Sequence, residues 1–351
     1  MKGTSLLDNA AIAELLAREA EQASGSMRQA FRRAARKAFL WEQEAYDLLA
    51  AGKSLTELEG IGPFLAHRIR EWFEKTPPLF SPPEIRAGFL TLTRARQVLS
   101  ENPSFGEALQ GDLHAHTCWS DGTGTVAEMA AAARSRGYGY LAITDHTKAL
   151  KIARGLSEEQ LFDQGKEIES VNAVLAEKGI DLVILKSAEV NLSPLGQADL
   201  IPSALQGLDL IIGSFHSALR RTEDQTERYL AALRNQTMHI LGHPQGRIFD
   251  HRVGLRADWA RVFSEAAQLD KAVEIDGYPD RQDLKLSLLR LALKEGARIS
   301  LGTDAHHPWQ LRFMEFSLAA AILAGFNPPQ IVNFLDADGL RKWVSQISQP
   351  R

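Results

Sequence analysis

The sequence predicts an α/β protein, and three observations support this fold class. Helical periodicity covers roughly the first hundred residues, and from about residue 107 short β-rich runs alternate with helical ones. Such alternation is typical of parallel β/α units. Histidines and acids follow the strand candidates, at the ends where parallel barrels build their sites. Seven strand candidates separated by helices are compatible with a closed barrel or with a doubly wound sheet.

Composition limits the class of protein. The 351 residues are 24% charged and 44% hydrophobic, which is ordinary for a globular chain. A formal net charge of −4 means that any polyanion must be bound by a local basic patch. A single cysteine, Cys118, excludes an internal disulfide framework and a cysteine-rich zinc site. We recognise neither a membrane span nor a signal peptide and expect a cytoplasmic protein with no membrane partner.

The first part of the chain, residues 1–83, is predicted to be a small helical domain. Apolar residues recur at helical spacing in its first fifty positions. Within residues 55–74, Gly60-Ile61-Gly62 separates two short amphipathic helices. Four prolines in the segment TPPLFSPP block helix continuation and mark a boundary near 76–83. A linker helix is expected within residues 84–106.

The second part, residues 107–351, carries the strand candidates. In order, they are the approach to LHAH, then YLAIT, LVIL, LDLIIGSF, MHILG, KAVEI and ARISLG. Helical segments separate these runs, and we detect no internal repeat or low-complexity tract between them. This order predicts parallel strands whose carboxyl ends share one face.

Imidazoles and carboxylates gather at the ends of these strands. Two residues apart, His114 and His116 project from the same face of a strand. Later motifs add more such groups, and the full set is His114, His116, Asp121, His146, Glu189, His216, His243, Asp304 and His306. So many of these groups on one rim would be costly unless cations neutralised them. Mixed nitrogen and oxygen ligands suit zinc, iron or manganese.

The motifs DLHAHTCWSDG, TDH, AEVN, FHS, GHP and TDAH, in this order, resemble those of the polymerase-and-histidinol-phosphatase (PHP) family of metal-dependent phosphoesterases. The pattern is similar to the PHP domains fused to bacterial family X DNA polymerases. The resemblance implies a distorted (β/α)7 barrel that binds three divalent metal ions. It assigns the first metal to His114, His116, Glu189 and Asp304; the second to Glu189, His216 and His243; and the third to Asp121, His146 and His306. Paired cations of this kind bind phosphate and activate water.

Basic residues near these motifs are candidates for holding a substrate phosphate. They are Arg247, Arg281 and Lys148, with Arg252 a further candidate. Each could instead form a structural or solvated ion pair. We interpret Cys118, beside the first histidines, as a small buried side chain and not as a ligand.

The helical part suggests DNA as a partner. The segment LEGIGPFLAHRI resembles a helix-hairpin-helix, whose Gly60 and Gly62 let backbone N–H groups approach a DNA phosphate without reading sequence. Residues 8–75 resemble the small lyase-type domain that opens family X polymerases. Arg28, Arg32 and Arg36 form a basic stripe at helical spacing, or else a solvated helix face.

Two departures from that resemblance limit the expected activities. About 35 residues separate the hairpin from the PHP-like part, so we expect neither a polymerase catalytic domain nor nucleotide transfer. Arg68 stands where the lyase family has its Schiff-base lysine. A guanidinium stays protonated and cannot form that imine, so lyase activity by that route is not expected.

The expected function is hydrolysis of phosphoester bonds at DNA ends, as a 3′–5′ exonuclease or 3′-phosphatase in DNA repair. One alternative is a small-molecule phosphatase of the histidinol-phosphate type, and another is a non-catalytic DNA-end-binding adaptor with structural metals. A hydrolase of cyclic amides is disfavoured by Glu189 and by the Asp304-x-His306 ending. The sequence indicates no particular protein partner.

Overall fold

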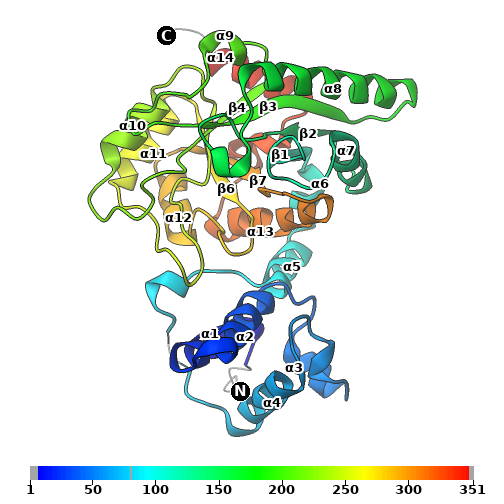
Figure 1. Ribbon diagram of the computed structural model, residues 1–351, viewed down its shortest axis with the longest axis vertical. Coiled ribbons are helices and arrows are strands. Elements are labelled where there is room, and N and C mark those ends of the chain that lie inside the picture. The colour runs from blue at the N-terminus through cyan, green and yellow to red at the C-terminus, as the bar shows by residue number, and fades with distance from the viewer. Residues whose placement is uncertain (1–6, 80, 348–351) are drawn as a thin grey trace.

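Parallel strands and helices alternate from residue 111 onward. The computed structural model describes residues 7–79 and 81–347. The expected domain ends, residues 1–6 and 348–351, and Phe80 in the proline-rich boundary lie outside the described residues. A small helical domain lies at one end of the molecule and the α/β domain at the other (Figure 1).

The α/β domain contains one sheet of seven parallel strands in sequence order, which confirms the seven predicted strands. The strands are β1 (Gly111–Ala115), β2 (Tyr140–Ile143), β3 (Val183–Asn191), β4 (Leu210–Ser214), β5 (Ile240–Leu241), β6 (Ala272–Asp276) and β7 (Arg298–Gly302). The first and last strands also meet, because Ala115 bridges Ala305 in parallel and His116 N donates to Ala305 O at 2.7 Å. The fold is therefore a nearly closed (β/α)7 barrel and not a doubly wound sheet.

The longest strand, β3, pairs with two neighbouring strands along different parts of its length. Its first half pairs with β2, where Val183 lies opposite Tyr140. Its second half pairs with β4, where Asn191 lies opposite Ser214. The second half carries Glu189, which is completely buried within the barrel.

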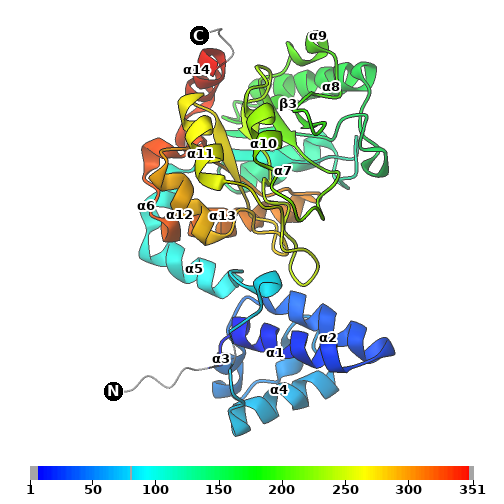
Figure 2. The same cartoon turned by 90° about the vertical axis from the view of Figure 1, so that its left-hand side faces the viewer.

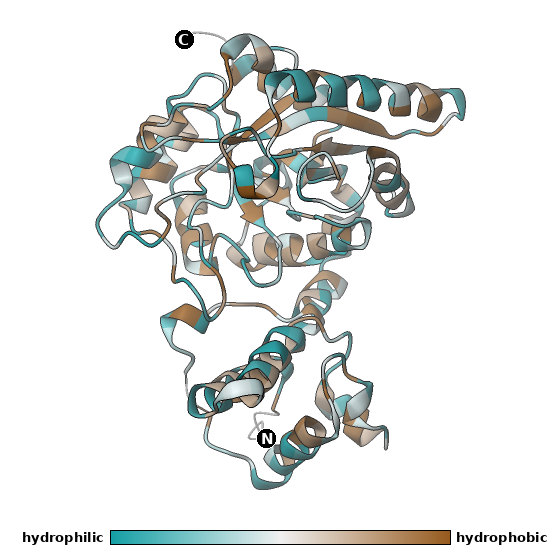
Figure 3. Cartoon of the chain, in the orientation of Figure 1, coloured by the Kyte–Doolittle hydropathy of each residue, from teal (hydrophilic) through white to brown (hydrophobic). Residues whose placement is uncertain are grey.

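Helices surround the barrel and bury their apolar faces on it. They are α7 (Val126–Ser135), α8 (Glu158–Glu177), α9 (Pro202–Leu205), α10 (Thr226–Leu233), α11 (Trp259–Gln268), α12 (Leu286–Lys294), α13 (Met314–Ala324) and α14 (Ala337–Ile347). Figure 3 shows α8 with alternating hydrophilic and hydrophobic surfaces, as expected of a helix that covers a core. No helix in the described ranges is long and apolar enough to cross a membrane.

The helical domain contains α1 (Asn9–Gln22), α2 (Gly25–Ala38), α3 (Ala45–Ala50) and α4 (Pro63–Lys75). Only a single 3-10 turn, Leu55–Glu57, precedes the Gly60–Gly62 turn, so the first helix expected within residues 55–74 is shorter than predicted. The chain becomes extended at Leu58, and Gly60 then adopts a positive φ of 80°. The second helix of the predicted hairpin is α4, with Gly62 at its N-cap and Pro63 at its first position.

The linker contains a 3-10 turn (Glu84–Arg86), α5 (Leu92–Glu101) and α6 (Pro103–Ala108). The single helix expected within residues 84–106 is thus divided at Asn102, because Pro103 cannot donate a helical hydrogen bond. The apolar face of α5 packs on α13 through residues that include Leu92 and Phe316.

The linker and the barrel loops hold the helical domain in place. The buried Arg86 guanidinium binds both carboxylate oxygens of Glu14, at 2.8 and 2.9 Å, and Asp250 Oδ1 at 3.0 Å. Phe249, after β5, packs edge-on against Phe39 and Phe89, with ring centroids 4.9 and 5.3 Å apart. Figure 2 shows the loops of the barrel reaching toward α1 and α2.

Candidate metal centre

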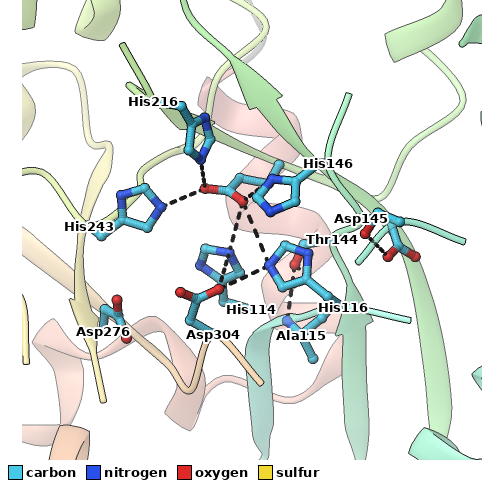
Figure 4. Close-up of polar contacts among 12 residues, drawn as sticks. His114, Ala115, His116, Thr144, Asp145, His146, His216, His243, Asp276 and Asp304 are labelled. Carbon is cyan, nitrogen blue, oxygen red and sulfur yellow. Dashed lines mark hydrogen bonds and ion pairs between the residues drawn. The ribbon is translucent and has the colours of Figure 1, made fainter. Parts of the chain in front are cut away.

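The nine predicted ligands lie together at the carboxyl ends of the strands. His114 belongs to β1 and Glu189 to β3, and the other seven lie in the loops that follow the strands. Figure 4 shows six of these side chains converging from different strands: His114, His116, His146, His216, His243 and Asp304. The barrel therefore brings together groups that are up to 192 positions apart in the sequence.

Glu189 lies at the centre of this group. Its Oε1 is 2.7 Å from His243 Nε2 and 3.1 Å from His216 Nε2. Its Oε2 is 2.7 Å from His146 Nδ1 and 3.5 Å from His114 Nε2. Burial alone would raise the pKa of Glu189, but the surrounding imidazoles hold it well below its usual value. The neighbouring imidazoles therefore favour the ionised carboxylate, and each of its two oxygens lies near imidazole nitrogens.

Two further carboxylates approach the remaining imidazoles. Asp304 Oδ1 lies 3.1 Å from His116 Nε2. Asp121 Oδ1 lies 3.3 Å from His306 Nε2 and 3.6 Å from His146 Nε2. Ligand atoms of three groups lie within 4.8 Å of one another: His116, Asp121, His146 and His306; His114, His116 and Glu189; and His146, Glu189 and His216. These groups overlap the three sets that the family resemblance implies, and His116 also lies beside the third set.

Several of these atoms are buried and make no hydrogen bond of good geometry among the described residues, although some of them lie close to one another. They are His114 Nε2, His116 Nδ1, His146 Nδ1, His216 Nε2, Glu189 Oε2 and Asp304 Oδ2. Leaving buried polar atoms unsatisfied costs free energy, so such a concentration of them needs an explanation. Nitrogen and carboxylate donors without hydrogen-bond partners are the ligand set that borderline divalent cations accept. The residues present therefore fit divalent metal ions.

The charges in the cluster shift the pKa values of its members in opposite directions. Burial and the neighbouring His306 and His146 lower the pKa of His116 to about 3. Burial would also lower that of His306, but Asp121 and Asp304 raise it to about 9. Burial would raise the pKa of Asp121, but the same imidazoles lower it to about 2. Protons are thus held on some imidazoles, and cations that bind there must displace them.

Glu274 is a functional candidate that the sequence analysis missed. It lies within β6 and is 1% exposed. Its Oε1 is 2.6 Å from His114 Nδ1, and its Oε2 accepts a hydrogen bond from His243 N at 2.6 Å. A carboxylate on one ring nitrogen fixes the tautomer, which leaves the other nitrogen free for a metal. The available signal was an acidic residue inside the otherwise apolar run KAVEI.

Asp276, at the end of β6, was also missed. It is fully buried, and its Oδ1 accepts from Tyr278 N at 2.6 Å. Burial and the nearby charge of Asp304 raise its pKa well above the usual value. The signal was the acid in the sequence EIDG, which follows the pattern of the other strand ends.

Other buried acids shape the loops that carry ligands. Asp145 accepts hydrogen bonds from Thr117 N at 2.8 Å and from Ser120 Oγ at 2.5 Å, next to His116 and Asp121. Asp283 accepts from the backbone N–H groups of Gln245, Gly246 and Arg247, just after His243. Two ligands, His243 and Asp304, adopt positive φ values of 22° and 51°. Sparsely populated backbone conformations are often found at functional sites.

The predicted phosphate-binding residues occupy different positions. Arg281 points to the cluster, since its Nη2 lies 3.3 Å from Asp304 Oδ2. Arg247 is buried against the linker, where it donates to Ala87 O at 2.8 Å and covers the ring of Phe89. Lys148 pairs with Glu158 at 2.5 Å on the surface. Arg252 donates to the backbone carbonyl of Gly246.

The predicted DNA-binding residues lie on the helical domain. Arg28, Arg32 and Arg36 are exposed along α2, and Arg32 Nε lies 3.6 Å from Asp250 Oδ2 of the barrel. Gly60 packs beside Lys37 of α2, whereas Gly62 has open space around its Cα. Arg68 forms ion pairs with Glu19 and Glu71. The expectation of a buried Cys118 was wrong, because this side chain is exposed.

Comparison with known proteins agrees with this geometry. The PHP domain family matches residues 112–278, which span the first six strands and most of the ligands. Residues 112–278 of this chain therefore form a PHP domain.

Individual relatives of the PHP domain differ in how much of their length matches. The DNA polymerase/3'-5' exonuclease PolX of Bacillus subtilis (strain 168) is 36% identical over 214 residues, which are 61% of this chain and 37% of that protein. A "Probable phosphatase" of Caldicellulosiruptor bescii is 25% identical over 64% of this chain and 91% of its own length. The histidinol phosphate phosphatase from Lactococcus lactis, solved with zinc, L-histidinol and phosphate, has a TM-score of 0.45 and 17% identity over 62% of this chain and 94% of its own.

Proposed function

We propose that this chain hydrolyses phosphoester bonds at DNA 3′ ends, as a 3′–5′ exonuclease or a 3′-phosphatase, with three divalent metal ions. The observation that supports this most strongly is the convergence of nine imidazole and carboxylate ligands around Glu189 within a PHP domain. The donor set favours zinc, manganese or iron. When bound, such ions hold a phosphate between them and make water acidic enough to attack at neutral pH.

The first metal would be held by His114, His116, Glu189 and Asp304, the second by Glu189, His216 and His243, and the third by Asp121, His146 and His306. Glu274 and Asp283 position these ligands through the hydrogen bonds described above. Arg281 keeps its charge beside Asp304 and is 30% exposed, so it can donate to a phosphate oxygen of the substrate. Its cation would stabilise negative charge that develops on the phosphoryl group.

Two observations favour DNA as the substrate. The similarity to PolX, a protein named as a 3'-5' exonuclease, is the first. The helical domain is the second, since its basic stripe and hairpin turn offer contacts to a phosphate backbone. We propose that this domain brings a DNA end to the barrel.

A small-molecule phosphatase is the second candidate, and a specific observation favours it. The matches to "Probable phosphatase" proteins cover 91% and 94% of those proteins, about the length of the barrel alone. In that case the helical domain would not act by bringing DNA to the barrel.

An assay of DNA and small-molecule substrates in parallel distinguishes the two candidate functions. Protein loaded with manganese or zinc is incubated with 3′-end-labelled DNA, with DNA that carries a 3′-phosphate, and with histidinol phosphate. We expect loss of label or of the 3′-phosphate from DNA, and no such loss with the His243→Ala variant. Turnover of histidinol phosphate alone would support the second candidate, and DNA binding without any hydrolysis would support a non-catalytic adaptor.

A further inference from the structure

Arginine side chains continue from the helical domain across the domain interface to the metal ligands. On α2, Arg32 Nε lies 3.6 Å from Asp250 Oδ2, in the barrel loop after β5. The next residue of that loop, His251, is exposed. His251 is followed directly by Arg252, and Arg36 lies one helical turn after Arg32 on α2. Burial and the positive charges of Arg220, Arg252 and Arg36 lower the pKa of His251. The carboxyl-terminal half of the stripe on α2 therefore adjoins the barrel.

The barrel side of the interface extends this positive surface. Arg220, in the loop after β4, is exposed, and its Nη2 lies 2.7 Å from His251 Nε2. Phe249 N donates to Asp280 O at 2.7 Å, which joins the loop that carries Arg252 to the loop that carries Arg281. Burial and the positive charges of Arg281 and Arg220 lower the pKa of Arg252. Arg281 in turn lies 3.3 Å from Asp304 Oδ2. A chain of neighbouring charges thus joins α2 to a metal ligand.

Apart from the candidate metal ligands, the acidic groups described along this route are fewer than its arginines. Asp250 is shared between Arg32 and the buried Arg86, which also binds Glu14 and Glu21. Asp280 acts on His251 and Arg281. Asp276 Oδ2 lies 4.0 Å from Arg281 Nε, and Asp283 acts on Arg252. Apart from the candidate metal ligands, these four aspartates face the five arginines Arg32, Arg36, Arg220, Arg252 and Arg281. We call these five arginines and His251 the arginine path.

We propose that the arginine path binds the phosphate backbone of a single DNA strand and leads its 3′ end from α2 to Arg281 and the metal ligands. This inference rests on the proposed function and adds Arg36, Arg220 and His251 as residues that touch the strand. Successive guanidinium groups suit a chain of phosphates, because each can donate in pairs to phosphate oxygens.

A single strand suits the path better than a duplex. The route ends at Arg281, which is 30% exposed, and at Asp304, which is 2% exposed. The terminal phosphodiester must therefore reach groups that are mostly covered by the protein, and one DNA strand is narrower than two. The protein touches phosphates along this route, so binding should depend on salt and hardly on sequence.

The test uses the full-length protein with Arg36→Gln, Arg220→Gln and the double substitution. Arg261→Gln on α11 is the matched control, because Arg261 is as exposed as Arg32, at 56% against 55%, and forms an ion pair with Glu227. Binding is measured by fluorescence anisotropy with a phosphorothioate single-stranded 20-mer from 50 to 200 mM salt. Hydrolysis of p-nitrophenyl phosphate by the manganese-loaded protein reports on the metal site.

We expect each path substitution to weaken binding several-fold at 50 mM salt. Each should also make the log–log salt slope shallower by about 0.7 for every phosphate that the variant no longer neutralises. The control and the small-ester hydrolysis should not change. Unchanged affinity and slope in the double variant, while the wild type binds and degrades DNA, would overturn the path and leave the proposed function standing. A wild type that hydrolyses the small ester but does not bind the 20-mer would overturn both the path and DNA as the substrate.

Discussion

Glu189 and Asp304 show how two carboxylates stay ionised inside the barrel. Both are almost completely buried, which by itself raises a carboxyl pKa. Imidazoles around Glu189 and the guanidinium of Arg281 beside Asp304 lower their pKa values well below the usual range. The site is thus built to hold charge, and cations are the partners that its donors suit.

Glu274→Gln should weaken metal binding and activity about 10- to 100-fold, the usual effect of losing a carboxylate that orients a ligand. Glutamine can offer an oxygen to only one of the two groups that Glu274 now accepts from, His114 Nδ1 and His243 N. The amide N–H₂ of the glutamine then faces the other of these two donors, with which it cannot form a hydrogen bond. Metal affinity by chelator competition and kcat/KM on a small phosphoester are the measurements.

Glu177→Gln, at the exposed end of α8, is the control for this change. Glu274→Gln with wild-type metal affinity and kcat/KM would contradict a positioning role for Glu274. A circular dichroism spectrum identical to that of the wild type excludes unfolding as the cause of a loss.

His239 predicts a pH dependence of stability. It is 4% exposed, its Nδ1 accepts from Ile211 N at 3.0 Å, and burial together with Lys271 lowers its pKa to about 4. The unfolded chain binds a proton near pH 6.5, whereas the folded chain does so only near pH 4. The free energy of unfolding should therefore fall as the pH drops from 6.5 to 4, by at most about 3 kcal/mol from this group.

His239→Asn keeps an acceptor and removes the titration. Urea denaturation at pH 7 and pH 4.5 should show a smaller loss of stability in this variant than in the wild type. Equal losses in the two proteins would exclude His239 as the source.

The convergence of the nine candidate metal ligands could be predicted from the sequence because their chemistry and their position coincide. Each is an imidazole or carboxylate at or just after a strand, and parallel strands bring these ends together. Glu274 could not be assigned a role in this way, because its partner His114 is 160 positions away and their contact depends on the closed barrel. The sequence also could not predict that Arg281 points to the cluster or that Arg247 is buried against the linker. Both positions depend on contacts between distant parts of the chain.

At the scale of elements, the loops after β5, β6 and β7 attach the helical domain. Phe249 packs with Phe39, Gln282 exchanges hydrogen bonds with the backbone of Leu90, and Arg312 lies 2.9 Å from Glu42. These loops also carry or adjoin metal ligands. The linker is therefore part of the support for the site and not a passive connection.

Arg86→Met tests this interface. The substitution leaves the buried carboxylate of Glu14 without the guanidinium that binds both of its oxygens. Removing one partner of a buried ion pair costs about 3–5 kcal/mol of stability. Denaturation of Arg86→Met should show a loss of that order, against little change for Arg94→Met, which is exposed on α5. A loss below about 1 kcal/mol would mean that the network does not hold the domains.

Gly62→Val tests the hairpin turn apart from the fold. Gly62 has a φ of −85°, and a Cβ there would meet no atom within 4 Å, so the folded chain has room for valine. Gly60 offers no such test, because its φ is 80°. We expect Gly62→Val to weaken DNA binding by crowding the backbone N–H groups, with an unchanged melting temperature and metal content. Wild-type affinity would show that this turn does not contact DNA.

The sequence predicted where the strands lie along the chain, but it did not predict how the linker packs. Short β-rich runs alternating with helical periodicity identified all seven strands, and the proline-rich segment follows the end of α4 at Lys75. Closure of the barrel depends on the contact between β1 and the residues after β7, which no local pattern reveals. The shortened turn at Leu55–Glu57 follows from backbone conformations at Leu58 and Gly60 that the helical spacing did not indicate.

At the scale of the whole molecule, the helical domain is attached through the loops at the carboxyl ends of the strands. These loops also surround the candidate metal ligands, so a DNA strand bound on α2 would lie beside the loops that form the proposed site. The proximity of the two sites is the structural reason for treating both domains as parts of one enzyme.

The metal content of the purified protein tests the central claim most directly. Protein prepared without chelator and supplemented with zinc, manganese and iron is analysed by inductively coupled plasma mass spectrometry, beside the Asp304→Ala variant. We predict about three transition-metal ions per chain for the wild type, since nine ligands supply three overlapping sets, and fewer for the variant, with the fold retained. A wild-type protein that binds no transition metal would contradict a metal-dependent phosphoesterase.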